Sequence, residues 1–116
     1  MSAMEFPPAE KLDLSRVMYA LSDPTRLEIV RELAGARGRG LTCCALQGAR
    51  PKSSMSHHFK ILRQAGVIET QVEGKEHYNR LRSADLETRF PGLIKSVTRA
   101  LALPRRGRDK SPRRAA

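Results

Sequence analysis

Residues 51–66 constrain the fold of this chain more than any other segment, because they combine a helical apolar repeat with an unusual polar face. On a helix of 3.6 residues per turn, Met55, Phe59 and Leu62 share one side. The proline that opens the segment suits a helix start, and the glycine that closes it suits a helix stop. The pattern predicts an amphipathic helix that packs its apolar side on a core.

The polar face of this helix carries hydroxyl, imidazole and ammonium groups, and residues 51–66 contain no Asp or Glu. A solvated surface helix usually carries Glu and Lys pairs, whereas these groups can donate hydrogen bonds to phosphates and base edges. We interpret the segment as the recognition helix of a DNA-binding domain; the alternative is a basic surface helix. The candidate base-edge or phosphate contacts are Ser53, Ser54, Ser56 and His57, and the candidate phosphate contacts are Lys52 and Lys60.

The net charge supports an anionic partner. The 116-residue chain carries a formal charge of +10, and its pI is about 10.6. Residues 104–116 hold six Arg or Lys and one Asp, so residues 1–103 carry the other +5. A basic balance favours nucleic acid or another anionic surface. A non-specific nucleic-acid-binding protein without an inducer is therefore an alternative to a sequence-specific one.

The order of predicted elements indicates one mainly α domain with a small β-hairpin, a winged helix-turn-helix. Residues 1–10 are expected to form a flexible arm, residues 11–103 the folded domain and residues 104–116 a disordered basic tail. We expect Asp23 to cap the second helix, Thr42 the third and Ser83 the fifth. Helices are predicted over residues 11–21, 24–34, 43–47, 51–65, 84–90 and 91–103, and strands over 67–72 and 76–81.

Three segments carry a resemblance to the ArsR/SmtB-type repressors, which are bacterial regulators that respond to metals, metalloids or thiol reagents. They are residues 20–27 (ALSDPTRL), residues 56–68 (SHHFKILRQAGVI) and the wing tip at residues 73–75. The resemblance covers about residues 12–103. It implies a homodimer that is joined by its first and last helices, binds an imperfect inverted repeat in double-stranded DNA and blocks transcription. Independently, the lack of a membrane span, of a secretory signal and of a disulfide framework predicts a cytoplasmic protein.

Residues outside the recognition helix add to this picture. Lys75 and Arg80 on the wing are candidate contacts to the neighbouring DNA backbone or minor groove; an idle solvated charge is the alternative for each. His58 lies beside the apolar stripe, so we expect a hydrogen-bonded boundary histidine rather than a base reader. The apolar faces of residues 12–21 and 91–103 exceed what one small domain can cover, which favours a dimer.

Cys43 and Cys44 are the candidate sensor. Resembling repressors that bind arsenite or soft metals often carry Cys-x-Cys here, but Thr42 replaces the first of these cysteines. Neighbours on a helix project about 100° apart, so a converging thiolate pair does not follow. The family's zinc site on the last helix is also missing, because residues 91–103 contain no His, Asp or Glu.

Three interpretations of the cysteines stay open. They are small buried apolar residues, a thiol switch for oxidants or electrophiles, or part of a metalloid site with another ligand. The start of the short third helix, together with Arg37, Arg39 and Arg50, would favour the thiolate anion and so a lowered thiol pKa, and the sequence leaves this point open.

Other classes of protein are disfavoured. No stretch approaches eighteen apolar residues, and the first residues do not form a secretory signal, so we expect neither membrane insertion nor export. No nucleophile, base and orienting residue can be assembled, and there is no Gly-rich phosphate loop after a strand. The sequence therefore predicts no enzyme, no cofactor and no metal site.

Overall fold

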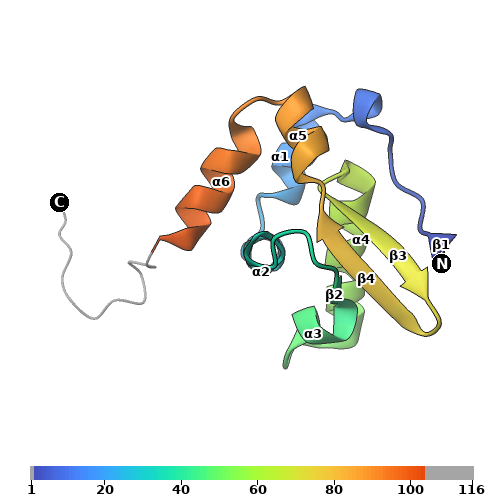
Figure 1. The fold of residues 1–116 in the computed structure, drawn as a ribbon. Helices are drawn as coiled ribbons and strands as arrows, with labels where there is room; N and C mark the ends of the chain where they lie inside the picture. The colour runs from blue at the N-terminus through green and yellow to red at the C-terminus, as the bar shows by residue number, and fades with distance from the viewer. Residues whose placement is uncertain (1, 104–116) are drawn as a thin grey trace, which may run out of the picture.

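The computed structural model describes residues 2–103, and the predicted basic tail lies outside these residues. Figure 1 shows a helical domain from which a β-hairpin projects. The winged helix-turn-helix prediction is confirmed. In chain order the elements are β1 (Ser2–Ala3), a 3-10 turn η1 (Ala9–Lys11), α1 (Leu14–Ala20), α2 (Pro24–Gly35), β2 (Leu41–Thr42), α3 (Cys43–Gln47), α4 (Lys52–Ala65), β3 (Ile68–Glu73), β4 (Glu76–Leu81), α5 (Ser83–Arg89) and α6 (Leu93–Ala102).

The sheet is antiparallel with the strand order β1-β3-β4-β2. The β3–β4 hairpin is the predicted wing, and its strands pair from Ile68 and Leu81 to Glu73 and Glu76. The short strands β1 and β2 were not predicted. Two residues are too few to show the alternation that marks a strand, and only the hairpin edges they pair with define them.

The predicted helix ends are largely confirmed. The carboxylate of Asp23 accepts hydrogen bonds from the backbone N–H groups of Thr25 and Arg26 at 2.8 and 3.1 Å, and so caps α2. The hydroxyl of Thr42 accepts one from the N–H of Ala45 at 3.0 Å and caps α3. Gly66 ends α4 with a φ of 84°, a conformation that glycine adopts at little cost.

Some boundaries differ by a few residues. Pro51 is the extended residue before α4 rather than its first helical residue. The first predicted helix is shorter, because Asp13 caps α1 and a separate turn precedes it. Ser83 is the first residue of α5 rather than its cap. The last helix begins at Leu93, after Gly92 with a φ of 86°.

The core lies between α4, the helices packed on it and the base of the wing. α4 packs against α1, α2 and β3, and α6 packs against α2 and α5. The buried apolar residues come from all of these elements: Leu12, Val17, Ala20, Leu21, Ile29, Val30, Leu33, Leu46, Met55, Phe59, Leu62, Ala65, Val67, Ile68, Leu86 and Ile94. The predicted apolar stripe of the recognition helix is therefore confirmed as its buried side.

The start of the chain differs from the predicted flexible arm. β1 pairs with β3, and the backbone N–H of Met4 donates to the carbonyl of Thr70 at 2.9 Å. The guanidinium of Arg82, a buried residue, donates to the carbonyl of Pro7 at 2.7 Å and lies 4.9 Å from the centre of the Phe6 ring. This arginine folds the arm onto the domain, and no local pattern in residues 1–10 indicates it.

No helix among residues 2–103 is long and apolar enough to cross a membrane. The longest, α4, has 14 residues and so measures about 21 Å at 1.5 Å per residue, shorter than the hydrocarbon core of a bilayer.

Candidate nucleic-acid interface

The recognition helix is anchored by one face and exposed by the other. Met55, Phe59, Leu62 and Ala65 are buried. The opposite face is exposed and presents Lys52, Ser53, Ser54, Ser56, His57, Lys60 and Gln64. The helix therefore stands on the domain with its hydrogen-bond donors facing outward, as a helix that enters a DNA groove must.

α3 and α4 form the helix-turn-helix, and the residues between them set their angle. Gly48 follows α3 with a φ of 60°, and Gln47 closes the turn by donating to the carbonyl of Arg50 at 2.8 Å. Leu46 is the buried residue of α3 and joins the core beside α4. A single apolar anchor thus holds α3 across the start of α4.

The wing ends in a tight turn that presents a lysine. Glu73 pairs with Glu76, so Gly74 and Lys75 form a two-residue loop. Gly74 has a φ of 62°, which suits the first position of the tight turns that join antiparallel strands. Lys75 is exposed at the tip, and the predicted hairpin turn is confirmed.

The structure brings three candidate residues together around one hollow. This hollow, which we call the α3–wing hollow, has a volume of about 460 Å³ and lies between α3, α4 and the wing tip. Lys52 and Ser56 line it from α4, and Lys75 lines it from the wing. Two ammonium groups from elements far apart in sequence therefore share one concave surface.

Two candidate residues are engaged in contacts within the domain. The Ser54 hydroxyl donates to the carbonyl of Pro51 at 3.1 Å, within its own turn. Nε of Arg80 donates to the carbonyl of Gly38 at 2.8 Å and holds the loop before β2 against β4. Arg80 is four residues along β4 from Glu76, about 13 Å from the tip at 3.3 Å per residue. Arg80 thus holds a loop of the domain and lies away from Lys75, and its contact with DNA stays a prediction.

The remaining candidates, Ser53, His57 and Lys60, are exposed on α4 and do not line the α3–wing hollow. Their side chains lie along the outer face of the helix, away from the buried stripe. They are therefore accessible to a ligand that runs along α4.

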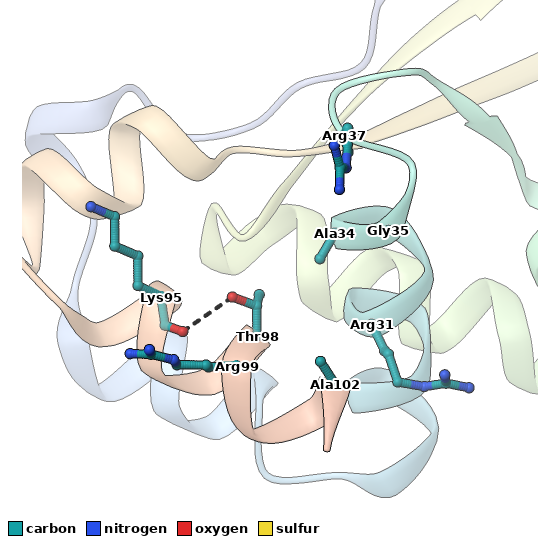
Figure 2. A pocket seen from close by; sticks show the side chains of 8 residues that line it. All are labelled: Arg31, Ala34, Gly35, Arg37, Lys95, Thr98, Arg99 and Ala102. Atoms are coloured by element: carbon teal, nitrogen blue, oxygen red, sulfur yellow. Dashed lines mark hydrogen bonds between the residues drawn. The ribbon is translucent and has the colours of Figure 1, made fainter. Parts of the chain in front are cut away.

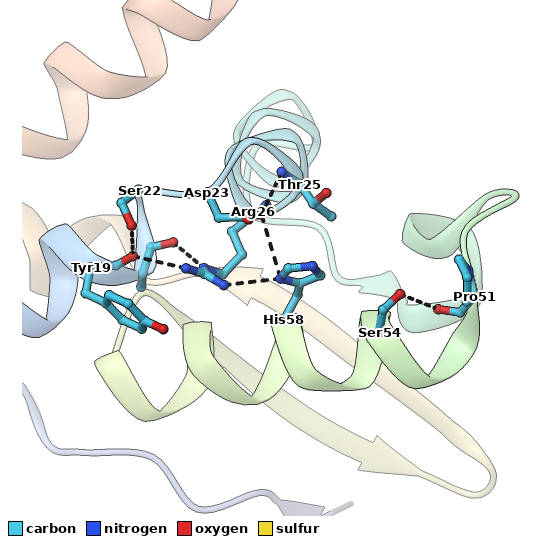
Figure 3. A network of polar contacts seen from close by, with 9 residues as sticks. Tyr19, Ser22, Asp23, Thr25, Arg26, Pro51, Ser54 and His58 are labelled. Carbon is cyan, nitrogen blue, oxygen red and sulfur yellow. Dashed lines mark hydrogen bonds and ion pairs between the residues drawn. The ribbon is translucent and has the colours of Figure 1, made fainter.

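His58 is the boundary histidine that its position predicts. Figure 3 shows it between α4 and the corner that joins α1 to α2. Its Nδ1 lies 3.2 Å from Nη1 of Arg26 and 3.8 Å from the Asp23 carboxylate. Because a guanidinium only donates, Nδ1 accepts this bond and the neutral ring carries its proton on Nε2.

Charges and burial in this cluster oppose protonation of His58. Burial lowers its pKa from the ordinary 6.5, and the nearby cations, Arg26 first, lower it further, against the opposing effect of Asp23. For Asp23, burial raises the pKa, but the hydrogen bonds from the backbone N–H groups of Arg26 and Thr25 and the charge of Arg26 outweigh it, so the pKa is lowered. The folded state thus holds a neutral imidazole beside an ionised carboxylate.

Arg26 is the residue that sequence reasoning passed over. It is buried, and besides His58 it donates through Nε to the carbonyl of Ala20 at 2.7 Å and through Nη2 to that of Tyr19 at 3.2 Å. Its Cζ lies 5.2 Å from the centre of the Tyr19 ring. The signal was present in the Asp-Pro-Thr-Arg segment, where a charged residue falls on the inner side of α2.

The two cysteines differ in exposure, and both are free thiols that line the α3–wing hollow. Cys43 is half-buried, and its Sγ accepts a hydrogen bond from Nδ2 of Asn79 at 3.3 Å. Burial raises its pKa, and this outweighs the opposing effect of the Asn79 bond. The lowered thiol pKa that the sequence leaves open is therefore not found at Cys43. Cys44 is exposed.

Asn79 is a second residue without a role in the sequence prediction. It is fully buried on β4, accepts from the Thr70 hydroxyl at 2.7 Å and donates to the carbonyl of Leu41 at 3.2 Å. This amide therefore connects both strands of the wing to β2 and, through Cys43, to α3. An asparagine in a strand gives no sign from sequence that it is buried.

Among the side chains that the structure describes, no group of three or more His, Cys, Asp or Glu residues could hold a metal ion.

A helix-turn-helix followed by a β-hairpin wing defines a winged helix-turn-helix DNA-binding protein. A family model described as a helix-turn-helix domain matches residues 21–71. The chain is 34% identical over 86 residues to the uncharacterized HTH-type transcriptional regulator YceK of Bacillus subtilis, an alignment that covers 72% of this chain and 84% of YceK. The chain therefore belongs to the HTH-type transcriptional regulators.

Solved structures agree on the fold. The transcriptional repressor BigR from Xylella fastidiosa superposes with a TM-score of 0.59 at 22% identity, covering 78% of this chain and 88% of BigR. An ArsR family transcriptional regulator superposes with a TM-score of 0.59 at 19% identity, covering 86% of this chain and all of that one. The chain therefore shares the fold of these two regulators.

Proposed function

We propose that this regulator is a dimeric, sequence-specific repressor that binds an imperfect inverted repeat in double-stranded DNA. The observation that carries the proposal is the exposed donor face of α4, beside which the wing tip places Lys75 and also Glu76. Lys52, Ser56 and Lys75 converge on the α3–wing hollow, and no carboxylate lies on α4. In this arrangement α4 reads base edges through Ser53, Ser56 and His57, while Lys52, Lys60 and Lys75 hold the phosphates.

The dimer in this proposal is supported by apolar side chains that the described chain leaves uncovered. Leu14, Met18 and Tyr19 of α1 are 49, 52 and 60% exposed, and Leu103 after α6 is 64% exposed. Leu14 and Met18 are four residues apart, so they lie on the same side of α1. A second copy packed on α1 and α6 would cover these side chains, and its two-fold symmetry would match an inverted repeat.

The proposed signal is an oxidant or electrophile that modifies Cys44. The thiol is exposed and lines the α3–wing hollow beside Lys52 and Lys75. An electrophilic carbon would form a C–S bond there, and the thiol proton would pass to the electrophile's other end. The adduct would occupy the surface that the phosphate backbone needs, and it would press α3 away from α4. Cys43 is less suited, since it is half-buried and hydrogen-bonded to Asn79.

The test is a selection of bound duplexes from a random DNA library, followed by titration of the selected and a scrambled duplex at one salt concentration. We expect a recurrent inverted repeat and at least about 10³-fold tighter binding to it. Sedimentation should give twice the 13.0 kDa chain mass for the free protein, and the complex should contain two chains per duplex. A ratio close to one between the affinities for the selected and the scrambled duplex would instead identify a non-specific basic nucleic-acid-binding protein.

A further inference from the structure

A second concave surface, which we call the α2–α6 cleft, lies between α2 and α6 and has a volume of about 690 Å³. Arg31 and Arg37 line it from α2 and the loop that follows, and Lys95 and Arg99 line it from α6. Figure 2 shows small side chains between them, among them Ala34 and Ala102. None of the described residues that line the cleft is acidic.

The charge around the cleft is poorly compensated. Arg31 forms an ion pair with Glu28 at 2.8 Å. Within the described part of the chain, no ion pair reaches the side chains of Arg37, Lys95 or Arg99. Lys95 and Arg99 are also like charges four residues apart on one helix, a spacing that disfavours the helix by a few tenths of a kcal/mol.

The side chains of two of these cations leave the centre of the cleft open. In Figure 2 the guanidinium groups of Arg31 and Arg99 extend in opposite directions, away from the centre of the cleft. Both residues are exposed, and exposed side chains change rotamer within nanoseconds. An anion between them would therefore remove the repulsion, and the guanidinium groups could turn inward onto it.

Arg37 gives an independent reason to assign a ligand to this cleft. It has a φ of 53°, the one positive value among the described residues other than glycine. This left-handed conformation costs an L-residue roughly 1–2 kcal/mol, and glycine adopts it without that cost. Arg37 thus places its guanidinium at the edge of the cleft although its backbone conformation is unfavourable for any residue except glycine. Such backbone outliers cluster at ligand sites.

We infer that the α2–α6 cleft binds a compact anion with two or more negative charges, of the phosphate-bearing or polycarboxylate class. Its volume lies within the range of small-molecule sites, about 300–1,000 Å³. Guanidinium groups bind phosphate and carboxylate with paired, charge-assisted hydrogen bonds. The four cations surround one hollow rather than forming a row, which suits a small ligand better than an acidic protein segment.

The cleft is separate from the proposed DNA surface, so the inference does not depend on the proposed function. α6 packs on α2, and β4 and α4 also pack on α2 (Figure 1). None of the residues that line the cleft lines the α3–wing hollow. An anion held by both α2 and α6 would tie the last helix to α2, on which the recognition helix α4 packs.

The experiment is a calorimetric titration of the full chain with pyrophosphate and with citrate, at ionic strength held constant with NaCl. We expect saturable binding of one anion per chain and a rise in melting temperature at saturating anion. Arg37→Gly and Arg99→Gln should each weaken binding about tenfold, because each removes a charge-assisted contact. Arg37→Gly should not lower the melting temperature of the protein alone, since glycine suits the positive φ.

Arg39→Gln is the matched control. It removes one charge from an exposed residue of the same loop that does not line the cleft, so binding should change less than about twofold. Equal weakening by Arg39→Gln, or no saturable binding of either anion, would overturn the inference. It would also be overturned if Arg37→Gly and Arg99→Gln weakened duplex DNA binding more than Arg39→Gln, or if a polyglutamate peptide bound more tightly than both anions.

Discussion

Arg26 and His58 are 32 positions apart in the sequence, yet Nη1 of Arg26 lies 3.2 Å from Nδ1 of His58. The contact joins α2 to the middle of the recognition helix, and the same guanidinium binds two carbonyls at the end of α1. One buried cation therefore fixes the position of α4 relative to α1 and α2. The orientation of the proposed DNA-reading face depends on it.

Replacing Arg26 should therefore lower the free energy of unfolding. Arg26→Met keeps much of the side-chain volume but removes the donor to the Ala20 carbonyl, whereas the Tyr19 carbonyl still accepts from the backbone N–H and the hydroxyl of Ser22. We expect the free energy of unfolding to fall by about 2 kcal/mol, since one unsatisfied buried group costs about 1–3 kcal/mol. Urea denaturation measures this directly. Lys60→Met, an exposed change on α4, is the control, and similar losses in both variants would contradict the assignment.

The stability of the protein should depend on the protonation of His58. Its pKa in the folded state lies below the 6.5 of an ordinary histidine, so acid protonates the unfolded chain first. The stabilising effect is present above pH 6.5 and is lost as pH falls through the lowered pKa. His58→Gln keeps an acceptor for Arg26 but cannot titrate. The urea midpoint should therefore fall more from pH 7.5 to pH 5.5 in the wild type than in His58→Gln. Equal falls in the two proteins would argue against this role of His58.

Base readers and phosphate contacts should respond differently to mutation. His57→Ala or Ser56→Ala should lose about 1–3 kcal/mol of preference for the selected operator over random DNA. Lys75→Ala should weaken both duplexes alike and lower the slope of log affinity against log salt by about one. Fluorescence anisotropy at four salt concentrations separates the two effects, and identical behaviour would refute the assigned faces.

Arg80→Ala provides the matched comparison within the wing. Both Arg80 and Lys75 lose one charge on becoming alanine, but only Arg80 donates to the carbonyl of Gly38. We expect Arg80→Ala to lower the melting temperature and to change the salt slope less than Lys75→Ala does. Combined melting curves and salt titrations test this. If Arg80→Ala left the melting temperature unchanged and reduced the salt slope by about one, Arg80 would be a phosphate contact rather than a loop contact.

The two cysteines should respond unequally to thiol reagents. Treatment with a quinone or peroxide should release the wild type and Cys43→Ser from the operator, whereas Cys44→Ser should stay bound. The reason is access, because Cys44 is exposed and Cys43 is half-buried beneath Asn79. Release by micromolar arsenite that Cys44→Ser abolishes would point to a metalloid site instead. An absence of release in every variant would leave both cysteines as packing residues.

The sequence alone determined the elements that local chemistry controls. The apolar period of residues 51–66 defined α4 and its buried face, because a helix places every third or fourth residue on one side. Asp23, Thr42 and Gly66 marked helix ends because their side chain, or the lack of one, acts on the nearest backbone. Lys75 at the wing tip followed from a turn that requires glycine beside it.

Only the tertiary structure decided what depends on partners distant in sequence. Arg82 folds the first residues onto the domain, Arg80 belongs to a loop contact, and burial raises the pKa of the Cys43 thiol. The α2–α6 cleft gathers cations from two helices that are about sixty residues apart in the chain. Burial, desolvation and the convergence of charges are set by packing, so the order of residues does not reveal them.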